Sequence, residues 1–277
     1  MEIFHSVNKI FEQSFKDNWD CPALSNYNGV TLYYKDLARR IAELHHIYST
    51  CGLKRGDKVA ICSKNQANWA VAFMSALTYG AVPVPILHEF KPGNIHHLVN
   101  HSESRVLFVD DQIWENLNEA EMPEVLVVVQ INALKVLLAR TPEVESARAH
   151  LQEVMDRLYP DGFNPSCVDY YEDSADELAV INYTSGTSGF SKGVMLSYGN
   201  LYGNFYFASS VHGHLCNTSN TIAMLPSAHM YGLMYDILFE LSRGVHIHFL
   251  TRLPSPKVIM QAMEVVKPDL IIAVPLL

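Results

Sequence analysis

The residues with the clearest chemical potential lie in one short segment, YTSGTSGFSKGV at positions 183–194. Its three glycines let the backbone turn its N–H groups toward one point, because no Cβ stands in the way. Its hydroxyl side chains add hydrogen-bond donors, and Lys192 adds a charge that compensates a bound anion. The order of residues is not that of a Walker-type G-x-x-x-x-G-K-[ST] loop. At this stage the segment is either a loop that wraps an anion or a polar hairpin turn.

The segment needs a scaffold, and the surrounding chain predicts an α/β fold. Apolar runs at 57–63, 105–110 and 125–130 are typical of strands buried on both faces, and helical patterns separate them. This alternation predicts mostly parallel sheets covered by helices. Apolar residues at helical spacing ahead of Gly52 predict an amphipathic helix. The uncharged segment 65–87 is long enough to span a bilayer, but its Asn, Gly and Pro residues favour a helix followed by a strand.

Two strands are expected to flank the glycine-rich segment itself. Residues 178–184 (LAVINYT) lead into it and residues 192–197 (KGVMLS) lead out of it, both as buried strands. Ser197 is then placed to cap the following helix. Residues 132–160 are expected to be helical, and the acidic, turn-rich segment 161–177 is expected to be a surface connector or domain boundary. Later in the chain we expect strands at 221–227 and 245–250, a helix at 230–241 and another helix that begins after Ser255.

Composition narrows the range of functions. Of the 277 residues, 49% are hydrophobic and 18% are charged, as in a globular protein. The formal net charge of −9 argues against nucleic-acid binding, which relies on clustered Lys and Arg. The five cysteines show no CxxC spacing, so we expect reduced thiols, no structural zinc site and a cytoplasmic protein. The first residues lack the basic and apolar regions of a signal peptide.

The glycine-rich segment resembles the phosphate-loop signature of adenylate-forming enzymes, the superfamily of acyl-CoA synthetases, firefly-type luciferases and peptide-synthetase adenylation domains. The usual pattern there is [YF]-T-S-G-[ST]-[ST]-G-x-P-K-G-V. Residues 33–86 are similar to the opening of those enzymes, with their G-x-x-x-G-D-x-V turn and A-x-x-x-G-A-V-x-V-P strand start. Residues 225–233 (LPSAHMYGL) are similar to the next core motif, L-P-x-x-H-x-x-G. Ser191 stands where the family usually has Pro, which predicts altered loop mobility and no lost phosphate ligand.

The resemblance implies an ATP-dependent activation of a carboxylic acid to an acyl-adenylate, followed by transfer of the acyl group to coenzyme A. It implies that Lys192 is catalytic, because it offsets the charge that builds on the leaving pyrophosphate. Thr184 would orient the phosphates together with Mg²⁺, and His229 would act as a catalytic gate between the acyl pocket and the nucleotide. The residues implied to bind the β- and γ-phosphates are Thr184, Ser185, Gly186, Thr187, Ser188, Gly189, Lys192 and Gly193.

The sequence predicts the family but leaves several substrates open. The His motif and the bulky apolar helices resemble the acyl-CoA branch, so the leading interpretation is a long-chain-fatty-acid–CoA ligase. One alternative is a ligase that loads an acyl carrier protein or belongs to a peptide synthetase. Another is a non-catalytic nucleotide- or acyl-binding remnant. Acyl chain length, oligomeric state and peripheral membrane contact stay open.

Several segments of the family have no counterpart in these 277 residues. They are the Y-G-x-T-E and T-G-D motifs, the hinge, and the small C-terminal domain that carries a lysine. We therefore expect residues 1–277 to be a partial N-terminal AMP-binding domain, the first part of the large domain. Such a fragment is expected not to turn over by itself.

Other chemically capable side chains receive structural interpretations. His97 and His101 have the i, i+4 spacing of two metal ligands, but no third ligand is in view, so exposed histidines are expected. His246 and His248 lie on one face of a strand and are expected to make satisfied polar contacts. Most bulky side chains near the two motifs are expected in the core, with a few lining an acyl pocket. They are Tyr202, Phe205, Tyr206, Phe207, Met230, Tyr231 and Met234.

Overall fold

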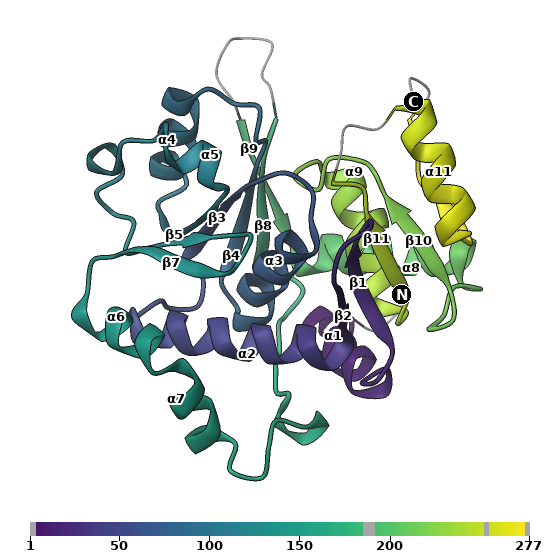
Figure 1. Cartoon of the computed structure of the whole chain (residues 1–277), viewed down its shortest axis with the longest axis horizontal. Coiled ribbons are helices and arrows are strands. Elements are labelled where there is room, and N and C mark those ends of the chain that lie inside the picture. Colours follow the sequence, from purple (N-terminus) through teal and green to yellow (C-terminus); the bar gives the residue numbers. More distant parts are fainter. Residues whose placement is uncertain (1–3, 185–191, 252–254, 275–277) are drawn as a thin grey trace.

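The computed structural model describes residues 4–184, 192–251 and 255–274 of the chain. Within these ranges the strands form two five-stranded sheets and a separate two-stranded hairpin. Figure 1 shows the two sheets side by side, with helices packed around them. Most strand pairs in the two sheets are parallel, so the predicted α/β fold is confirmed.

The first sheet has the order β4-β3-β5-β6-β7. Its first four strands are parallel, and β7 closes one edge antiparallel to β6. Helix α3 connects β3 to β4 and ends at Gly80, whose φ of 82° suits a residue without a Cβ. The bounds are β3 (Lys58–Cys62), α3 (Ala67–Tyr79), β4 (Val82–Ile86), α4 (Pro92–His101), β5 (Ser104–Val109), α5 (Asp111–Trp114), η1 (Glu119–Glu121), β6 (Val127–Gln130) and β7 (Lys135–Ala139).

The second sheet has the order β12-β10-β11-β1-β2 and combines the start of the chain with its last third. Four of its strands are parallel, and β2 is the antiparallel edge. The helical stretch between β10 and β11 contains a π-turn, η3, between α9 and α10. The bounds are β1 (Pro22–Asn26), β2 (Thr31–Tyr33), β10 (Asn220–Ala223), α9 (Met230–Leu233), η3 (Met234–Leu238), α10 (Phe239–Ser242), β11 (His246–Phe249), α11 (Pro256–Val266) and β12 (Leu270–Ile271).

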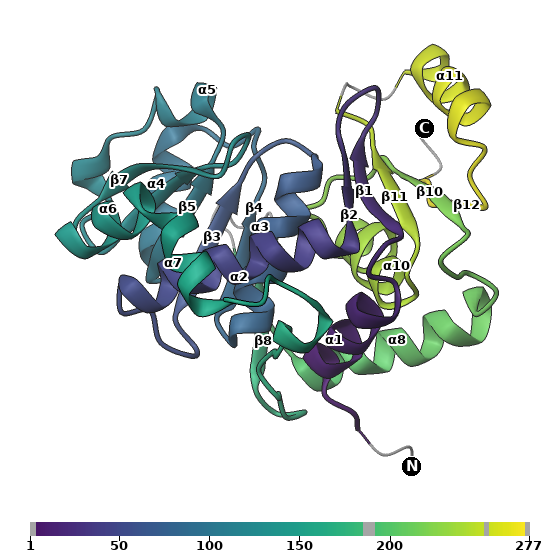
Figure 2. The same cartoon turned by 60° about the horizontal axis from the view of Figure 1, so that its bottom comes forward.

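Helix α2 (Tyr34–Thr50) joins the two sheets into one core. It packs against α3 beside the first sheet and against β1 and β2 of the second, as can be followed in Figure 2. Trp69 and Phe73 of α3 are fully buried, with ring centroids 5.5 Å apart in a stacked arrangement. No helix in the described ranges is long and apolar enough to cross a bilayer. The segment 65–87 forms α3 and β4 instead, as predicted.

Two features of the early chain differ from the sequence expectation. Residues 132–160 are not helical throughout, because β7 precedes α6 (Pro142–Ala149) and α7 (Leu151–Leu158). A run of five residues such as KVLLA is too short for periodicity to separate strand from helix, and pairing with β6 decides the outcome. Helix α1 (Val7–Asp17) was not predicted. It packs its buried residues Phe11 and Phe15 into the common core.

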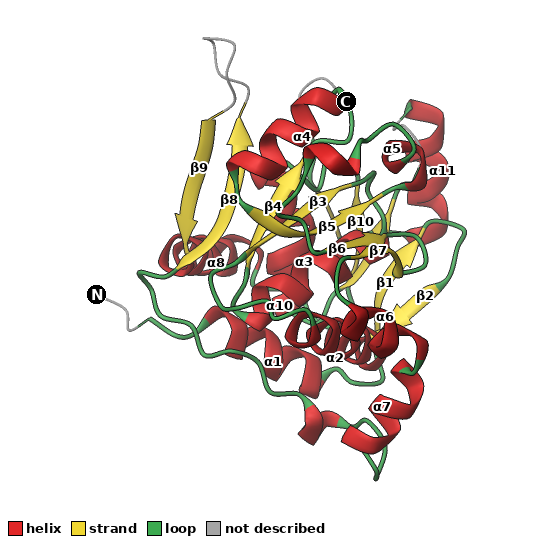
Figure 3. Ribbon diagram, turned by 90° about the vertical axis from the view of Figure 1, so that its left-hand side faces the viewer, coloured by secondary structure: helices red, strands yellow, loops and turns green. Residues whose placement is uncertain are grey.

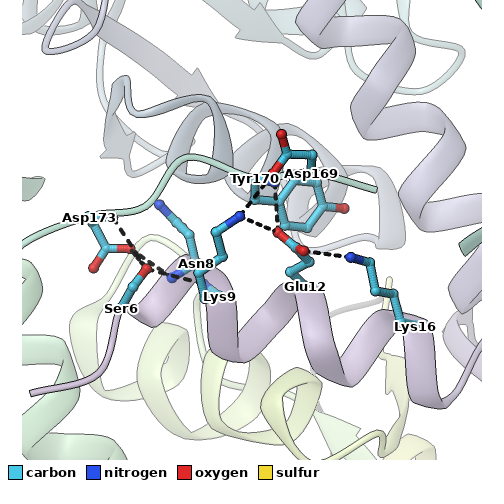
Figure 4. A network of polar contacts seen from close by, with 8 residues as sticks. All are labelled: Ser6, Asn8, Lys9, Glu12, Lys16, Asp169, Tyr170 and Asp173. Atoms are coloured by element: carbon cyan, nitrogen blue, oxygen red, sulfur yellow. Dashed lines mark hydrogen bonds and ion pairs between the residues drawn. The ribbon is translucent and has the colours of Figure 1, made fainter. Parts of the chain in front are cut away.

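The expected surface connector, 161–177, is partly buried and bound to α1. Apart from η2 (Pro165–Cys167), it contains no helix or strand. Asp173 is only 5% exposed, and its carboxylate accepts hydrogen bonds from the N–H groups of Val7 and Asn8 at 3.0 and 2.8 Å. Figure 4 shows this network, in which Glu12 also accepts from the N–H group of Tyr170 at 2.9 Å. The acidic side chain therefore satisfies the first free N–H groups of a helix, a role that composition alone did not reveal.

This network leads to a stability prediction. Replacing Asp173 with alanine leaves buried N–H groups of α1 without acceptors, so we expect a loss of about 1–3 kcal/mol in the free energy of unfolding. Urea unfolding at neutral pH measures the change. Asp173→Asn keeps one acceptor oxygen and is expected to lose less. An alanine variant as stable as the wild type would contradict this role.

The glycine-rich segment lies between the two strands of the hairpin, β8 (Leu178–Thr184) and β9 (Lys192–Ser197). The strands run antiparallel (Figure 3), and in their register Thr184 pairs with Lys192. Strand β8 is buried as predicted, but β9 is not, since Met195 is 67% exposed. Helix α8 (Tyr198–His212) follows, and Ser197 caps it as predicted by accepting from the N–H group of Asn200. Ser255 caps α11 in the same way, also as predicted.

Candidate active site

A cavity of about 590 Å³ lies between the hairpin, α8 and the helix that begins after His229. It brings the two recognised motifs together, because Thr184 at the end of β8 and His229 at the start of α9 both line it. Apolar side chains form most of the wall. The lining residues are Leu87, Asn182, Tyr183, Thr184, Val194, Leu196, Asn200, Leu201, Asn204, Ala228, His229, Met230, Tyr231, Met234 and Tyr235.

His229 has a defined local geometry at the edge of this cavity. It is the N-cap residue of α9, and its Nδ1 atom accepts a hydrogen bond from the N–H group of Tyr231 at 3.3 Å. This bond fixes Nδ1 as the acceptor and leaves Nε2 for a ligand. The packing around Gly232 explains why this position of the motif is a glycine. A Cβ at Gly232 would lie 2.8 Å from the carbonyl oxygen of Pro226, so a larger residue would displace the loop that carries His229.

The ends of the hairpin hold the described part of the phosphate segment. Thr184 and Lys192 are both exposed, and Lys192 has no ion-pair partner within the described ranges. A Cβ at Gly193 would approach the side chains of Ile181 and Tyr183 to 3.2 and 3.3 Å, which favours glycine there. The other predicted phosphate-binding residues, Ser185, Gly186, Thr187, Ser188 and Gly189, lie outside the described residues, as does Ser191.

Comparison with known proteins decides the family. The AMP-binding enzyme family matches residues 11–277, nearly the whole chain. The chain is therefore a member of the AMP-binding enzyme family. The predicted resemblance to adenylate-forming enzymes is confirmed.

Individual relatives are similar to this chain at low sequence identity, and solved structures share its fold. The long-chain-fatty-acid–CoA ligase of Salmonella typhimurium is 24% identical over 262 residues, which cover 87% of this chain and 46% of the relative. ATP-bound MatB from Rhodopseudomonas palustris has a TM-score of 0.73 at 21% identity, over 94% of this chain and 48% of that one. The anthranilate CoA ligase AuaEII, solved with anthranoyl-AMP, has a TM-score of 0.76 at 15% identity, over 98% of this chain and 50% of that one. The chain thus spans about half the length of the relatives it matches.

The bulky side chains near the motifs divide into three groups. Met230, Tyr231 and Met234 line the cavity, whereas Phe205 is buried in the core and Tyr202 packs against it partly buried. Tyr206 and Phe207 are 61% and 57% exposed, so the expectation that most of these residues are in the core is wrong for them. Helical periodicity was too weak along α8 to assign a buried face, because bulky residues occur all around it.

The two histidine pairs have the structural roles expected of them. His97 and His101 are exposed, and no group of three metal-binding side chains occurs in the described part of the chain. His101 also contacts Tyr183 through an Nδ1–hydroxyl hydrogen bond of 2.7 Å, which the sequence did not predict. His246 bonds to Ser25 at 2.8 Å and His248 to Asn220 at 3.2 Å. Burial lowers the pKa of His246 to about 4, so the imidazole is neutral at physiological pH.

Two buried carboxyl groups lie further along the helical stretch that begins after His229, and sequence reasoning missed both. Asp236 is 2% exposed and accepts from the N–H group of Leu225 at 3.2 Å. Glu240, 1% exposed, accepts from the hydroxyl of Thr221 at 2.6 Å. Burial raises the pKa of Asp236 to about 7 and raises the pKa of Glu240 well above its ordinary value. The pair therefore keeps at least one proton at neutral pH, and its signal in the sequence is only acidic residues inside an apolar helix.

Proposed function

We propose that this AMP-binding enzyme activates a fatty acid with ATP to give an acyl-adenylate and pyrophosphate, and then transfers the acyl group to coenzyme A. The supporting observation is the apolar cavity that Thr184 and His229 share, beside the hairpin that carries Lys192. The fatty acid and coenzyme A are named in the Salmonella relative, and ATP is named in the MatB structure. The five cysteines are free thiols, which supports a cytoplasmic setting.

Each polar group at the site has a role in this proposal. Lys192 and the backbone N–H groups of the glycine-rich segment bind the phosphates that leave as pyrophosphate, where negative charge builds in the transition state. The Thr184 hydroxyl is an oxygen donor of the kind that Mg²⁺ prefers, and a bound Mg²⁺ would neutralise phosphate charge. His229, whose Nδ1 atom accepts from Tyr231 and whose Nε2 atom has no hydrogen-bond partner among the described residues, orients the carboxylate at the boundary between the apolar cavity and the phosphates.

The proposed substrate class is tested by binding. We expect the chain to bind palmitate and octanoate saturably and to bind acetate and anthranilate weakly, because burial of each CH₂ contributes about 0.8 kcal/mol. Met230→Trp fills part of the cavity and should weaken palmitate binding at least about tenfold, measured by calorimetric titration. Met260→Trp is the matched control, since Met260 is 58% exposed on α11 and lies outside the cavity.

Three results would contradict the assignment to fatty acids. One is the absence of saturable palmitate binding. Another is unchanged palmitate affinity in Met230→Trp. The third is tighter binding of anthranilate than of any fatty acid, which would place the substrate with the aromatic acids named in a structural neighbour.

A further inference from the structure

The position of His229 depends on a short loop that has no regular structure of its own. We define the His229 loop as residues 224–229, between the end of β10 and the start of α9. Four of its residues are buried, whereas Pro226 and His229 are exposed. A loop without a strand or helix ladder takes its geometry from the side chains that bond its backbone.

Asn65 bonds this loop from the other sheet. Its Nδ2 group donates to the carbonyl oxygen of Leu225 at 2.5 Å, and its Oδ1 atom accepts from the N–H group of Ser227 at 2.8 Å. These two bonds hold the backbone on both sides of Pro226. Asn65 lies between β3 and α3 of the first sheet, while the loop belongs to the second sheet. One amide side chain therefore connects the two sheets, through bonds that lie five and three residues before α9 begins.

The residues beside Asn65 are held by hydrogen bonds of their own, so the backbone that carries Asn65 is fixed. The N–H group of Lys64 donates to Asp110 at 2.9 Å. The side chain of Gln66 donates to Asn132 at 2.9 Å, and the N–H group of Ala67 donates to Asn26 at 2.8 Å. Because its neighbours in the chain are held by these bonds, the Asn65 side chain keeps its position and holds the loop in one place.

Two further side chains bond the same loop, but from the elements that enclose it. Asp236 accepts from the N–H group of Leu225, and Asn182 donates to the carbonyl oxygen of Ala228 at 2.9 Å. Asp236 belongs to the helical stretch α9–α10 and Asn182 to the hairpin, so each side chain moves with its own element. Of these three side chains, Asn65 comes from the first sheet. Its two bonds therefore fix the loop relative to the common core.

We propose that Asn65 is a positioning residue for His229. It holds the His229 loop in the register that presents the imidazole to the cavity. The consequence for ligand binding rests on the function proposed above, whereas the consequence for His229 itself does not.

The test compares two asparagines, Asn65 and Asn68, that lie three positions apart in the chain. Asn65→Ala removes both bonds to the His229 loop. Asn68→Ala is the control, because Asn68 also bonds two backbone groups, the carbonyl oxygens of Ile131 and Asn132, at 2.9 and 2.8 Å, and it accepts a third bond from Arg40 at 2.6 Å. Asn65→Asp keeps an acceptor for Ser227 but loses the donor to Leu225, which makes it the intermediate case.

The readouts are thermal stability, the ring signal of His229 in isotope-labelled protein, and palmitate affinity. His229→Gln assigns the ring signal. We expect both alanine variants to lower the melting temperature, and Asn68→Ala to lower it at least as much as Asn65→Ala, because it loses one more hydrogen bond. Only the Asn65 variants should shift or broaden the His229 signal, and Asn65→Ala should weaken palmitate binding about tenfold. Asn65→Asp should change the His229 signal and palmitate affinity in the same direction but less. It replaces Asn65→Ala in the test if the alanine variant does not fold.

Two outcomes would overturn the proposal: an unchanged His229 signal in the folded Asn65 variants, or an equal change in Asn68→Ala. The failure of the proposed function looks different, because the wild-type chain would then bind no palmitate. The His229 signal would still decide whether Asn65 positions the loop.

Discussion

Replacing Lys192 with alanine in the longest protein that the gene encodes is expected to lower fatty-acid-dependent exchange of radiolabelled pyrophosphate into ATP by about 10²–10³-fold, the effect of removing one group that stabilises developing charge. Lys192 ends the hairpin opposite Thr184, is exposed, and has no ion-pair partner in the described parts of the chain. Its charge is therefore available to a phosphate. Because the leaving pyrophosphate gains charge in the transition state, the loss should fall mainly on kcat.

Two substitutions control for this effect. Lys192→Arg keeps the charge but changes its geometry, so it should retain part of the exchange activity. Lys257→Ala removes an exposed lysine of α11 and should leave the rate unchanged. If Lys192→Ala exchanged pyrophosphate at the wild-type rate, Lys192 would not act on the phosphates. The glycine-rich segment would then be a polar hairpin turn, the alternative that the sequence left open.

Replacing Asp236 with asparagine is expected to change the pH dependence of stability by about 2–4 kcal/mol between about pH 4 and pH 7. Burial raises the pKa of Asp236 to about 7 in the folded protein, whereas an unfolded chain ionises an aspartate near its ordinary value. In this window the folded wild type keeps a proton that the unfolded chain has lost. Its stability is therefore fully present at low pH and declines as pH rises through the window. The asparagine side chain of the variant cannot ionise, so the variant gains stability relative to the wild type as pH rises.

The measurement is urea unfolding of both proteins across this pH range, with the variant minus wild-type difference plotted against pH. Taking the difference removes groups common to both proteins, such as His45, whose pKa burial lowers to about 4. A difference that stays flat from about pH 4 to pH 7 would show that Asp236 titrates alike in the folded and unfolded states. The buried Asp236 carboxyl would then not keep a proton in this pH range, contrary to the assignment made from its burial.

Local signals in the sequence predicted those parts of the fold that neighbouring residues determine. The helix end at Gly80, the caps at Ser197 and Ser255, and the strands on either side of the glycine-rich segment all depend on nearby chemistry. The family followed from three motifs in the right order, and the family match confirms it.

The features that were missed depend on contacts between distant segments. Strand β7 exists because β6 pairs with it, and Asp173 is buried because the start of α1 offers it N–H groups. Asn65 had no signal of function in the sequence, since its partners Leu225 and Ser227 lie 160 and 162 residues away. The acidic residue Asp236 inside an apolar helix was the one available hint of the buried pair.

The most direct test of the proposed activity is to look for the acyl-adenylate itself. Because this chain spans about half the length of its relatives, the longest protein that its gene encodes is incubated with ATP, Mg²⁺ and a mixture of palmitate, octanoate, acetate and anthranilate. Mass spectrometry then identifies the products. We predict a fatty acyl-adenylate with an equal amount of pyrophosphate, replaced by the acyl-CoA when coenzyme A is added. Release of ADP and phosphate, or an adenylate of anthranilate alone, would contradict the assignment of this AMP-binding enzyme as a fatty-acid-activating ligase.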